Sequence, residues 1–548
     1  MSIQSQFITH DVTNQPQPLP ACNFWDIDLP LREAVARNGG DWATDRLGAY
    51  GALAGGELMA LGEAANRSRP VLHAVDAYGR RIDHVEFHPA YHSLMQSAMQ
   101  AGVHDFSWRH ASRAGAHVAR AALHYLHSQA DAGTGCPLTM THAAIPSLRQ
   151  APALADAWIT RVLASRYDPR TLPAARKTSN TLGMGMTEKQ GGSDVRSNTT
   201  RAIAQGDGSV ALVGHKFFFS APMSDAHLVL AQGDGGLGCF LMPRVLDDGT
   251  LNAVRIQRLK DKLGDWSNAS AEVEFQGALA WPVGAAGRGI QTILDMVALT
   301  RLDCMLGSAA GMRQALVQAL HHTRQRRAFG KLLVDQPLMR NVLADLALEN
   351  EAAIALSMRV ARAGEAGGRD AGEAAFASVA TAIGKYWVCR RAPAFVTEAQ
   401  ECLGGIGYVE DTLLPRLYRQ APLNSIWEGS GNVQCLDVLR ALAKEPGTRN
   451  ALFAELRPAR GLHPAFDRQF AALVDALDDP AALEARSRHL VEGMAQLLQA
   501  SLLLQSGDGG IGAAFCRARL GEDRGAAYGT LDAQAPIAAL IARVMPEV

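Results

Sequence analysis

The spacing of apolar residues over the first third of the chain predicts helices. Residues from about 30 to 180 are rich in Ala, Leu, His and Arg, and several apolar positions recur at the spacing of one helix face, for instance Val118, Ala121, Ala122 and Tyr125. We therefore expect residues 1–182 to form an N-terminal α-helical domain.

The pattern changes between residues 183 and 282. Gly-Asp turn signals at Gly206-Asp207-Gly208 and at Asp248-Gly249 separate short runs that are β-branched or alternating. The clearest run, Ala271 to Gln276, places apolar side chains on one face and polar side chains on the other, as a half-buried strand does. This segment is predicted to be a β-domain.

Helical stripes return after Pro282. One stripe contains Ile290, Ile293, Leu294 and Val297, and a second begins at Pro337, a residue that suits the first turn of a helix. Two further helices are expected over about 371–402, ending at Gly404-Gly405, and about 432–444. Four long helices predict a four-helix bundle over residues 283–444. Helical patches continue over residues 445–548, which we expect to form an added C-terminal helical domain.

Composition excludes several classes of protein. In 548 residues, 53 basic and 54 acidic side chains nearly cancel, so no global field draws the chain to nucleic acid or to an anionic membrane. The first twenty residues do not have the pattern of a signal peptide, and no apolar run is long enough for a membrane span, so a cytoplasmic protein is expected. The eight cysteines are scattered, without metal-ligand spacing, which favours buried free thiols and no metal site.

Two motifs lie in the β-domain. The first, Met186 to Val195, contains Gly191 and Gly192, which allow close backbone approach, and Thr187 and Ser193, whose hydroxyls can meet ligand oxygens. Taken alone, such a motif is more often an ordinary polar turn. The second, Lys216-Phe217-Phe218-Phe219-Ser220, offers an aromatic face and a hydroxyl to a planar ring, or is simply a hydrophobic strand.

Three more motifs lie in the predicted bundle. Arg326 and Phe329, followed by Gln336, can meet a pyrophosphate and cover an adenine, although a solvated basic helix end is the competing interpretation. Leu403 to Tyr408 resembles a glycine fingerprint but follows a helical pattern, so it favours a helix terminus over a dinucleotide fold. Ile426 to Asn432 places Glu428 beside Trp427. Desolvation there would raise the pKa of Glu428, which suits a base that removes a weakly acidic C–H proton.

The order and spacing of these motifs resemble those of the acyl-CoA dehydrogenase superfamily. Within the superfamily, the motif sequences MTEKQGGSDV, KFFFSAP, RLKDKLG and NSIWEGSGN are similar to those of the AidB-like alkylation-response flavoproteins. The segments from Asn14 to Pro18 and from Phe87 to Pro89 are also similar to this group. The fatty-acid enzymes of the superfamily usually have Pro in the first motif and Tyr-Glu-Gly-Thr in the last. The resemblance implies a mainly α fold with a central β-barrel: a helical domain, the barrel, a four-helix bundle and an added C-terminal helical domain.

The resemblance also implies the cofactor and the roles of individual residues. FAD would be contacted by Met186, Thr187, Gly192, Ser193, Phe218, Ser220, Gly404, Gly405, Ser430 and Asn432. Arg326, Phe329 and Gln336 would reach FAD held mainly by a neighbouring subunit of a homotetramer, and Glu428 takes the position of the catalytic base. One departure is Glu401, where typical members have Gln, so an FAD contact there is not expected.

Two functions follow from the resemblance. One is a protein of the adaptive response to DNA alkylation that binds duplex DNA through its C-terminal domain, with at most weak isovaleryl-CoA-type dehydrogenase activity; the other is a genuine dehydrogenase of a short or branched acyl-CoA. Residues 445–548 carry ten Arg against thirteen acids, and residues 290–345 carry seven basic groups against four acids. Local charge therefore does not strengthen DNA binding. Arg440 is a candidate for DNA contact or for simple helix packing.

Overall fold

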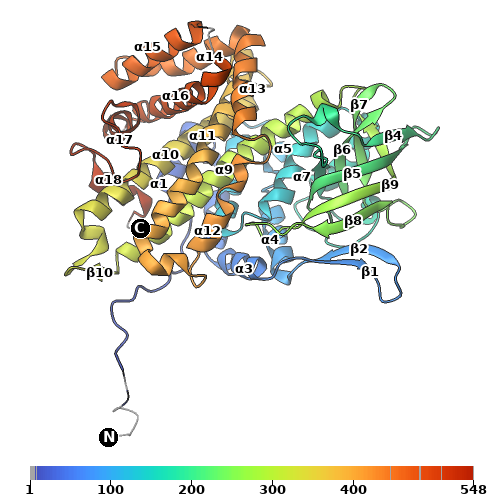
Figure 1. Cartoon of the computed structure of the whole chain (residues 1–548), viewed down its shortest axis with the longest axis horizontal. Helices are drawn as coiled ribbons and strands as arrows, with labels where there is room; N and C mark the ends of the chain where they lie inside the picture. The colour runs from blue at the N-terminus through green and yellow to red at the C-terminus, as the bar shows by residue number, and fades with distance from the viewer. Residues whose placement is uncertain (1–6, 8, 445, 480–482, 508, 547–548) are drawn as a thin grey trace.

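The computed structural model describes residues 7, 9–444, 446–479, 483–507 and 509–546. A helical body carries one β-domain at its side, and the last helices lie on the part of the body away from that domain (Figure 1). None of the helices in these ranges has the length and apolarity that a membrane span needs. Among the same residues no group of three or more His, Cys, Asp or Glu side chains is placed to hold a metal ion.

The first part of the chain is helical, as predicted, but it also contains a β-hairpin. Its helices are α1 (Leu29–Arg37), α2 (Thr44–Ala54), α3 (Glu57–Arg67), α4 (Pro89–Ala101), α5 (Phe106–Arg109), α6 (Ala116–Ala130), α7 (Gly135–Leu148) and α8 (Pro152–Val162). The hairpin pairs β1 (Val71–Val75) with β2 (Arg81–Glu86). Asp76 closes its turn by accepting hydrogen bonds from the backbone N–H groups of Tyr78 and Arg80 at 2.8 and 2.9 Å. The helical stripe pattern did not predict this hairpin because its strands are only five and six residues long.

Seven strands form the β-domain that the alternating pattern predicts. They are β3 (Leu182–Gly185), β4 (Arg201–Ala204), β5 (Val210–Ser220), β6 (Ala226–Gly233), β7 (Gly236–Pro243), β8 (Val254–Leu259) and β9 (Ser270–Val283). β6 pairs with both β4 and β7, and β9 pairs with both β5 and β7, so these five strands close into a barrel. β3 adds to β6 and β8 adds to β9.

The alternating run in β9 confirms its predicted burial with one exception. Ala271, Val273 and Phe275 are buried in the core. Glu272, expected on the polar face, is also buried, because two cations of β8 and its extension, Arg258 and Lys260, each lie 2.6 Å from its carboxylate.

Four helices dominate the region after the barrel, as predicted: α9 (Gly289–Thr323), α10 (Pro337–Ala366), α11 (Ala371–Leu403) and α13 (Gly431–Lys444). Pro337 stands in the first turn of α10. Asp370 caps α11 by accepting from the N–H groups of Gly372 and Glu373 at 2.7 and 3.1 Å. α11 ends at Leu403, and the next residue, Gly404, has a φ of +67°, which favours glycine. The short helix α12 (Leu414–Gln420) lies between α11 and α13.

The C-terminal region is helical and is tied to the bundle by ion pairs. It contains α14 (Pro446–Leu456), α15 (Pro464–Asp478), α16 (Leu483–Leu504), α17 (Gly509–Phe515) and α18 (Ile537–Val544). Arg519 lies 3.0 Å from Glu349 of α10 and also pairs with Asp345. Arg543 of α18 pairs with Glu351 of α10 at 2.8 Å and with Glu33 of α1 at 2.6 Å. Several of the arginines counted as C-terminal charge therefore bind carboxylates inside the protein.

Candidate active site

The turn before α13 holds Glu428 in a strained conformation. Its φ is +57°, a left-handed value that an L side chain adopts rarely, and Gly429 follows at +95°. Such a residue costs about 1–3 kcal/mol and persists only where neighbouring groups fix it. The backbone contacts of this turn therefore identify the residues that position Glu428.

Three side chains from three helices fix the turn. Lys385 of α11, which is buried, donates to the carbonyl oxygen of Trp427 at 2.7 Å and to that of Gly429. Arg301 of α9 donates through Nε to the carbonyl oxygen of Glu428 at 3.0 Å. Gln434 of α13 donates to the carbonyl oxygens of Glu428 and Gly429, each at 3.0 Å. Every carbonyl from residue 427 to residue 429 thus has a side-chain donor.

The carboxyl group of Glu428 has the character expected of a proton acceptor. Thr300 of α9 donates its hydroxyl to Oε2 at 2.7 Å. Burial raises the pKa of Glu428, and the Thr300 hydroxyl with the charges of Arg301 and Lys385 offsets only part of that rise. The residue keeps part of its surface exposed. The direction of this pKa shift agrees with the one that the motif predicts. The motif did not include the residues that contact Glu428 or its turn, which are Thr300, Arg301, Lys385 and Gln434.

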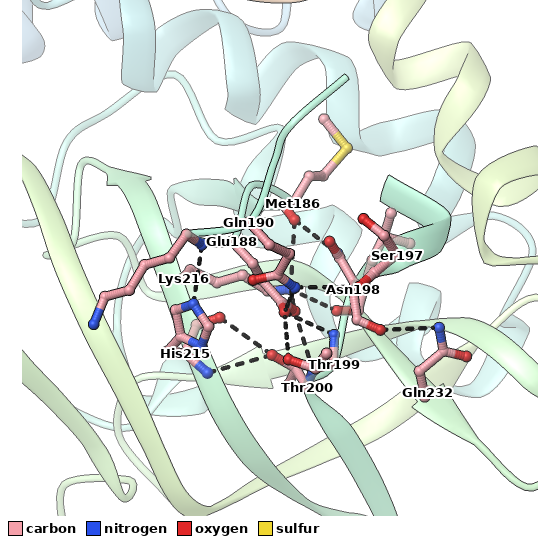
Figure 2. A network of polar contacts seen from close by, with 12 residues as sticks. Met186, Glu188, Gln190, Ser197, Asn198, Thr199, Thr200, His215, Lys216 and Gln232 are labelled. Atoms are coloured by element: carbon pink, nitrogen blue, oxygen red, sulfur yellow. Dashed lines mark hydrogen bonds and ion pairs between the residues drawn. The ribbon is translucent and has the colours of Figure 1, made fainter. Parts of the chain in front are cut away.

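The first glycine motif is fixed by a residue that the sequence interpretation passed over. Glu188 accepts from the Lys216 ammonium at 2.8 Å, from the N–H of Thr199 at 2.7 Å and from the N–H of Thr200 at 3.2 Å (Figure 2). Although burial raises it, the pKa of Glu188 is held well below its ordinary value by the hydrogen bonds from Lys216 and Thr200. Lys216 also donates to Leu230 of β6 at 2.8 Å, so the motif is anchored to the barrel.

Anchoring by Glu188 leaves the predicted ligand groups of this motif facing outward. Met186 and Thr187 are half-buried and Ser193 is exposed. Within the described part of the chain, the hydroxyls of Thr187 and Ser193 have no hydrogen-bond partner. At Gly192 a Cβ atom would lie 2.7 Å from the Thr187 hydroxyl, so a larger residue does not fit there. Open hydroxyls and backbone at this turn suit a phosphate or carbonyl ligand.

The second motif of the β-domain faces two ways. Phe219 is buried in the barrel core, whereas Phe218 keeps 51% of its surface exposed and Ser220 is half-buried. Lys260 lies 4.5 Å from the centre of the Phe218 ring. Met186 of the first motif and Trp427 of the last both pack against one hydrophobic cluster. An exposed aromatic ring beside open hydroxyls fits a planar cofactor such as FAD.

The residues predicted to reach a neighbouring subunit lie far from Glu428. Phe329 is 99% exposed with a φ of +52°, at the turn between β10 (Arg327–Ala328) and β11 (Lys331–Leu332). Gln336 donates to Ala328 O at 3.0 Å, and Arg326 donates to the Asn14 carbonyl of the N-terminal arm. From Thr300 to Thr323, α9 rises roughly 35 Å at about 1.5 Å per residue. One chain therefore does not bring this group to the Glu428 turn.

Gly404 and Gly405 also lie away from the Glu428 turn. α9 and α11 run in the same direction, because Lys385 lies near Thr300 and the Cys389 thiol contacts Cys304 O at 3.3 Å. Eighteen residues of α11 separate Lys385 from Leu403, about 27 Å of helix. The two glycines stand in open space, since a Cβ atom added at either would meet nothing within 4 Å. Their predicted contact with FAD remains a prediction.

The residues that follow Glu428 connect to the C-terminal region. Ser430 is half-buried before α13, and Asn432 Oδ1 accepts a hydrogen bond from Arg488 of α16 at 2.8 Å. Arg440 keeps 59% of its side chain exposed and pairs with Asp437, which also accepts from Arg301 at 2.8 Å. Arg440 is thus both open to solvent and linked through Asp437 to the Glu428 turn.

Comparisons with known proteins agree with this architecture. Three family models match the chain: "Adaptive response protein AidB N-terminal domain" at residues 14–169, "Acyl-CoA dehydrogenase, middle domain" at 183–278 and "Acyl-CoA dehydrogenase, C-terminal domain" at 287–443. AidB of Escherichia coli (strain K12) is 52% identical over 475 residues, covering 86% of this chain and 88% of that protein. Acyl-CoA dehydrogenase family member 11 of Caenorhabditis elegans is 31% identical, covering 78% of this chain and 71% of its own length. The solved structure of C. elegans ACDH-11 in complex with C11-CoA superposes with a TM-score of 0.84 at 26% identity, over 95% of both chains.

Proposed function

The chain belongs to the acyl-CoA dehydrogenase superfamily and to its AidB-like group, and from this premise we propose that it acts in the adaptive response to DNA alkylation, binding duplex DNA. FAD is the cofactor of the superfamily, and the open hydroxyls and the exposed Phe218 ring fit it. The observation that carries the proposal is the 52% identity to AidB over most of both chains. The dehydrogenase activity that remains is at most weak and of the isovaleryl-CoA type.

The residues of the site support a defined division of labour. FAD, when bound, would accept the hydride that leaves the β-carbon of the acyl chain, so that loss of the α-proton and of this hydride leaves a carbon–carbon double bond. Glu428 takes the proton from the carbon beside the thioester carbonyl, because its raised pKa favours the proton it gains. Thr300 orients the carboxylate through one oxygen and leaves the other for the substrate. Lys385, Arg301 and Gln434 keep the turn in place while the proton moves.

A genuine acyl-CoA dehydrogenase is the second candidate, and the retained, partly exposed Glu428 favours it. The C. elegans structure that resembles this chain was solved with C11-CoA, which makes acyl-CoA thioesters the substrates to test. Anaerobic addition of short and branched acyl-CoA thioesters should bleach the flavin at a rate that Glu428→Gln abolishes and that the exposed Glu410→Gln leaves unchanged. Complete absence of bleaching in the wild-type protein refutes this candidate and favours the DNA function.

Duplex binding is tested by its dependence on charge. Arg440 is the exposed candidate contact. In contrast, Arg301 and Arg313, which the charge count included, are used inside the protein: Arg301 holds the Glu428 turn, and Arg313 lies 3.1 Å from Asp28. Affinity for duplex should fall steeply with salt, and Arg440→Ala should reduce the slope by about one. Arg80→Ala, which breaks a similar surface pair with Asp76 on the distant hairpin, is the matched control. Absence of binding at low salt, or equal loss in both variants, would sink the proposal.

We also propose a homotetramer in which the Arg326, Phe329 and Gln336 group completes the FAD site of a neighbouring chain. The support is the separation of this group from Glu428 along α9 and the exposure of Phe329, at 99%, and Leu338, at 83%. Phe329→Asp should lower both the oligomeric mass measured by light scattering and the flavin content. A tetramer that keeps its flavin in this variant contradicts the proposal. The cytoplasmic location stays a prediction from the sequence.

A further inference from the structure

A cavity lies apart from the Glu428 turn, where the hairpin, α4 and the barrel meet. It has a volume of about 160 Å³. Its walls come from β2 and the following Phe87, from Tyr91, His92 and Met95 of α4, from the segment around Tyr167, and from Ala221 to Ser224 with Arg244 at the ends of β5 and β7. None of the groups that hold the Glu428 turn lines it. Pro137, at the start of α7, also lines it.

The floor of the cavity is aromatic. The rings of Phe87 and Tyr91 stack with centres 4.0 Å apart, and His92 meets Tyr91 edge-on at 5.5 Å. The Tyr167 ring stacks on His92 at 5.9 Å, and its hydroxyl lies 3.2 Å from His92 Nδ1. Burial lowers the pKa of His92, so at neutral pH this ring is uncharged. The floor therefore suits a flat or short apolar body.

The charges on the walls are paired, with one exception. Lys177 lies 2.6 Å from Asp225, Asp168 is bound by Arg170 at 2.7 Å, and Glu86 lies 2.8 Å from His73. Arg244 has no carboxylate within 4.0 Å anywhere in the described ranges. Its guanidinium donates to the Thr171 hydroxyl at 3.2 Å, and burial lowers its pKa despite the charges of Asp225 and Asp83 farther away. A guanidinium has five N–H donors, so several of those on Arg244 are left for a ligand.

The wall beside Arg244 is held in place by its own backbone. Ala221, at the end of β5, has a φ of +49° and donates its N–H to Ala269 O at 2.9 Å. Arg244 donates its backbone N–H to Asp225 O at 2.8 Å. Non-glycine residues in this conformation are kept where neighbours fix them, and they cluster at ligand sites. The wall of the cavity beside Arg244 is thus fixed by contacts of the protein itself.

We propose that this cavity binds a small organic carboxylate, with its carboxylate on Arg244 and a single ring or short carbon chain against Tyr91, His92 and Tyr167. A guanidinium is suited to a carboxylate because two parallel N–H donors match its two oxygens. The volume limits the ligand, because pockets for drug-sized molecules measure roughly 300–1,000 Å³. The proposal does not depend on the dehydrogenase or the DNA function.

The test is titration of the full-length, flavin-loaded protein by calorimetry with benzoate and hexanoate, each against its neutral counterpart, benzamide and hexan-1-ol. We expect the carboxylates to bind with dissociation constants of about 1 mM or tighter, and the neutral compounds to bind at least about tenfold more weakly. Arg244→Met should weaken the carboxylates at least about tenfold, whereas Arg176→Met, which removes an exposed cation outside the cavity, should not. Glu428→Gln should bind the carboxylates as tightly as the wild type does. Adding a carboxylate should leave the flavin spectrum of either protein unchanged.

In the titrations, three results would overturn the proposal: no carboxylate binding up to about 10 mM, equal affinity for acids and neutral compounds, or loss of binding in Glu428→Gln. A crystal of the wild-type protein soaked in 4-bromobenzoate keeps the test independent of any variant's folding. Bromine density between Arg244 and Tyr167 supports the site, and density only elsewhere refutes it. If Arg244→Met does not fold, Arg244→Lys keeps the charge but loses the fork and should weaken binding by a smaller factor.

Discussion

Replacing Lys385 by Met tests whether this residue of α11 fixes the strained Glu428 turn. The substitution keeps a long side chain in a buried position but removes the donor to the carbonyls of Trp427 and Gly429. It also removes a positive charge that lowers the pKa of Glu428. Two separable effects follow, one on stability and one on the protonation of the carboxylate.

The stability effect can be bounded from the contacts. A hydrogen bond to a charged group contributes about 1.5–3 kcal/mol, and Lys385 makes two of them. Gln434 still donates a hydrogen bond to the Gly429 carbonyl, so the loss of the Lys385 bond to that carbonyl is partly compensated. The left-handed Glu428 costs about 1–3 kcal/mol and can relax once it is released. We therefore expect a net loss of about 2–4 kcal/mol, read as a lower midpoint in urea unfolding.

The effect on protonation has a definite sign. Glu428 accepts a proton only as the carboxylate, so the rate of flavin bleaching falls as pH drops through its pKa. Loss of the Lys385 charge raises that pKa further, so the acidic limb of the profile should move to higher pH. The profile is measured by anaerobic stopped flow with whichever acyl-CoA bleaches the wild-type protein.

Two controls separate the positioning role from general damage. Lys385→Arg keeps the charge, so its pH profile should stay close to that of the wild type. Lys444→Met removes an exposed lysine at the end of α13 and should change neither readout. If Lys385→Met had the same urea midpoint and the same pH profile as the wild type, the role of Lys385 in positioning the Glu428 turn would be refuted. The unfolding arm decides the structural claim even if no acyl-CoA is a substrate.

Two further predictions concern the arm and the helical core. Asn14 binds Arg327 reciprocally, donating to its carbonyl at 2.9 Å and accepting from its N–H at 2.8 Å, so Asn14→Ala should loosen the β10–β11 turn and lower the ratio of flavin to protein absorbance. Thr9→Ala, which alters only an exposed contact with His10, is its control, and equal flavin content in both variants would contradict the role. Burial lowers the pKa of both His117 and His124 to about 4, so their neutral forms stabilise the fold fully above pH 6.5 and this stability is lost as pH falls toward 4. The midpoint of urea unfolding should therefore drop steeply between pH 6.5 and 4, and His117→Gln should make this dependence on pH less steep. An equally steep dependence in His117→Gln and in the wild type would refute the assignment.

Sequence patterns predicted the elements better than the contacts between them. Pro337, Gly404 and the stripes of the bundle mark helix ends and buried faces through local chemistry, and the structure confirms them. Thr300 and Lys385 gave no such signal, because a polar residue in an apolar helix does not reveal which distant loop it meets. Their partner, the Glu428 turn, lies 128 residues from Thr300 and about 40 residues from Lys385.

The charge count gave no support to DNA binding, and the structure lowers the available positive charge further. Arg313 is buried beside Asp28, and Arg519 and Arg543 join α10 to the C-terminal region. Pairing of this kind depends on which helices pack together, and composition carries no information about that. The surface available to a phosphate is therefore less basic than the sequence of the C-terminal region indicates, which makes the remaining exposed cations more decisive.

Arg440 is the candidate DNA contact, and its ion pair also links it to the turn that carries the candidate base. It shares Asp437 with Arg301, and Arg301 in turn donates to the backbone of Glu428. A phosphate that draws Arg440 away would leave Asp437 to Arg301 alone and strengthen the pair that holds the turn. The candidate DNA contact and the candidate base are thus connected by two ion pairs and one hydrogen bond. Retention of Glu428 is compatible with duplex binding, because Arg301 contacts both the backbone of Glu428 and the Asp437 carboxylate that pairs with Arg440.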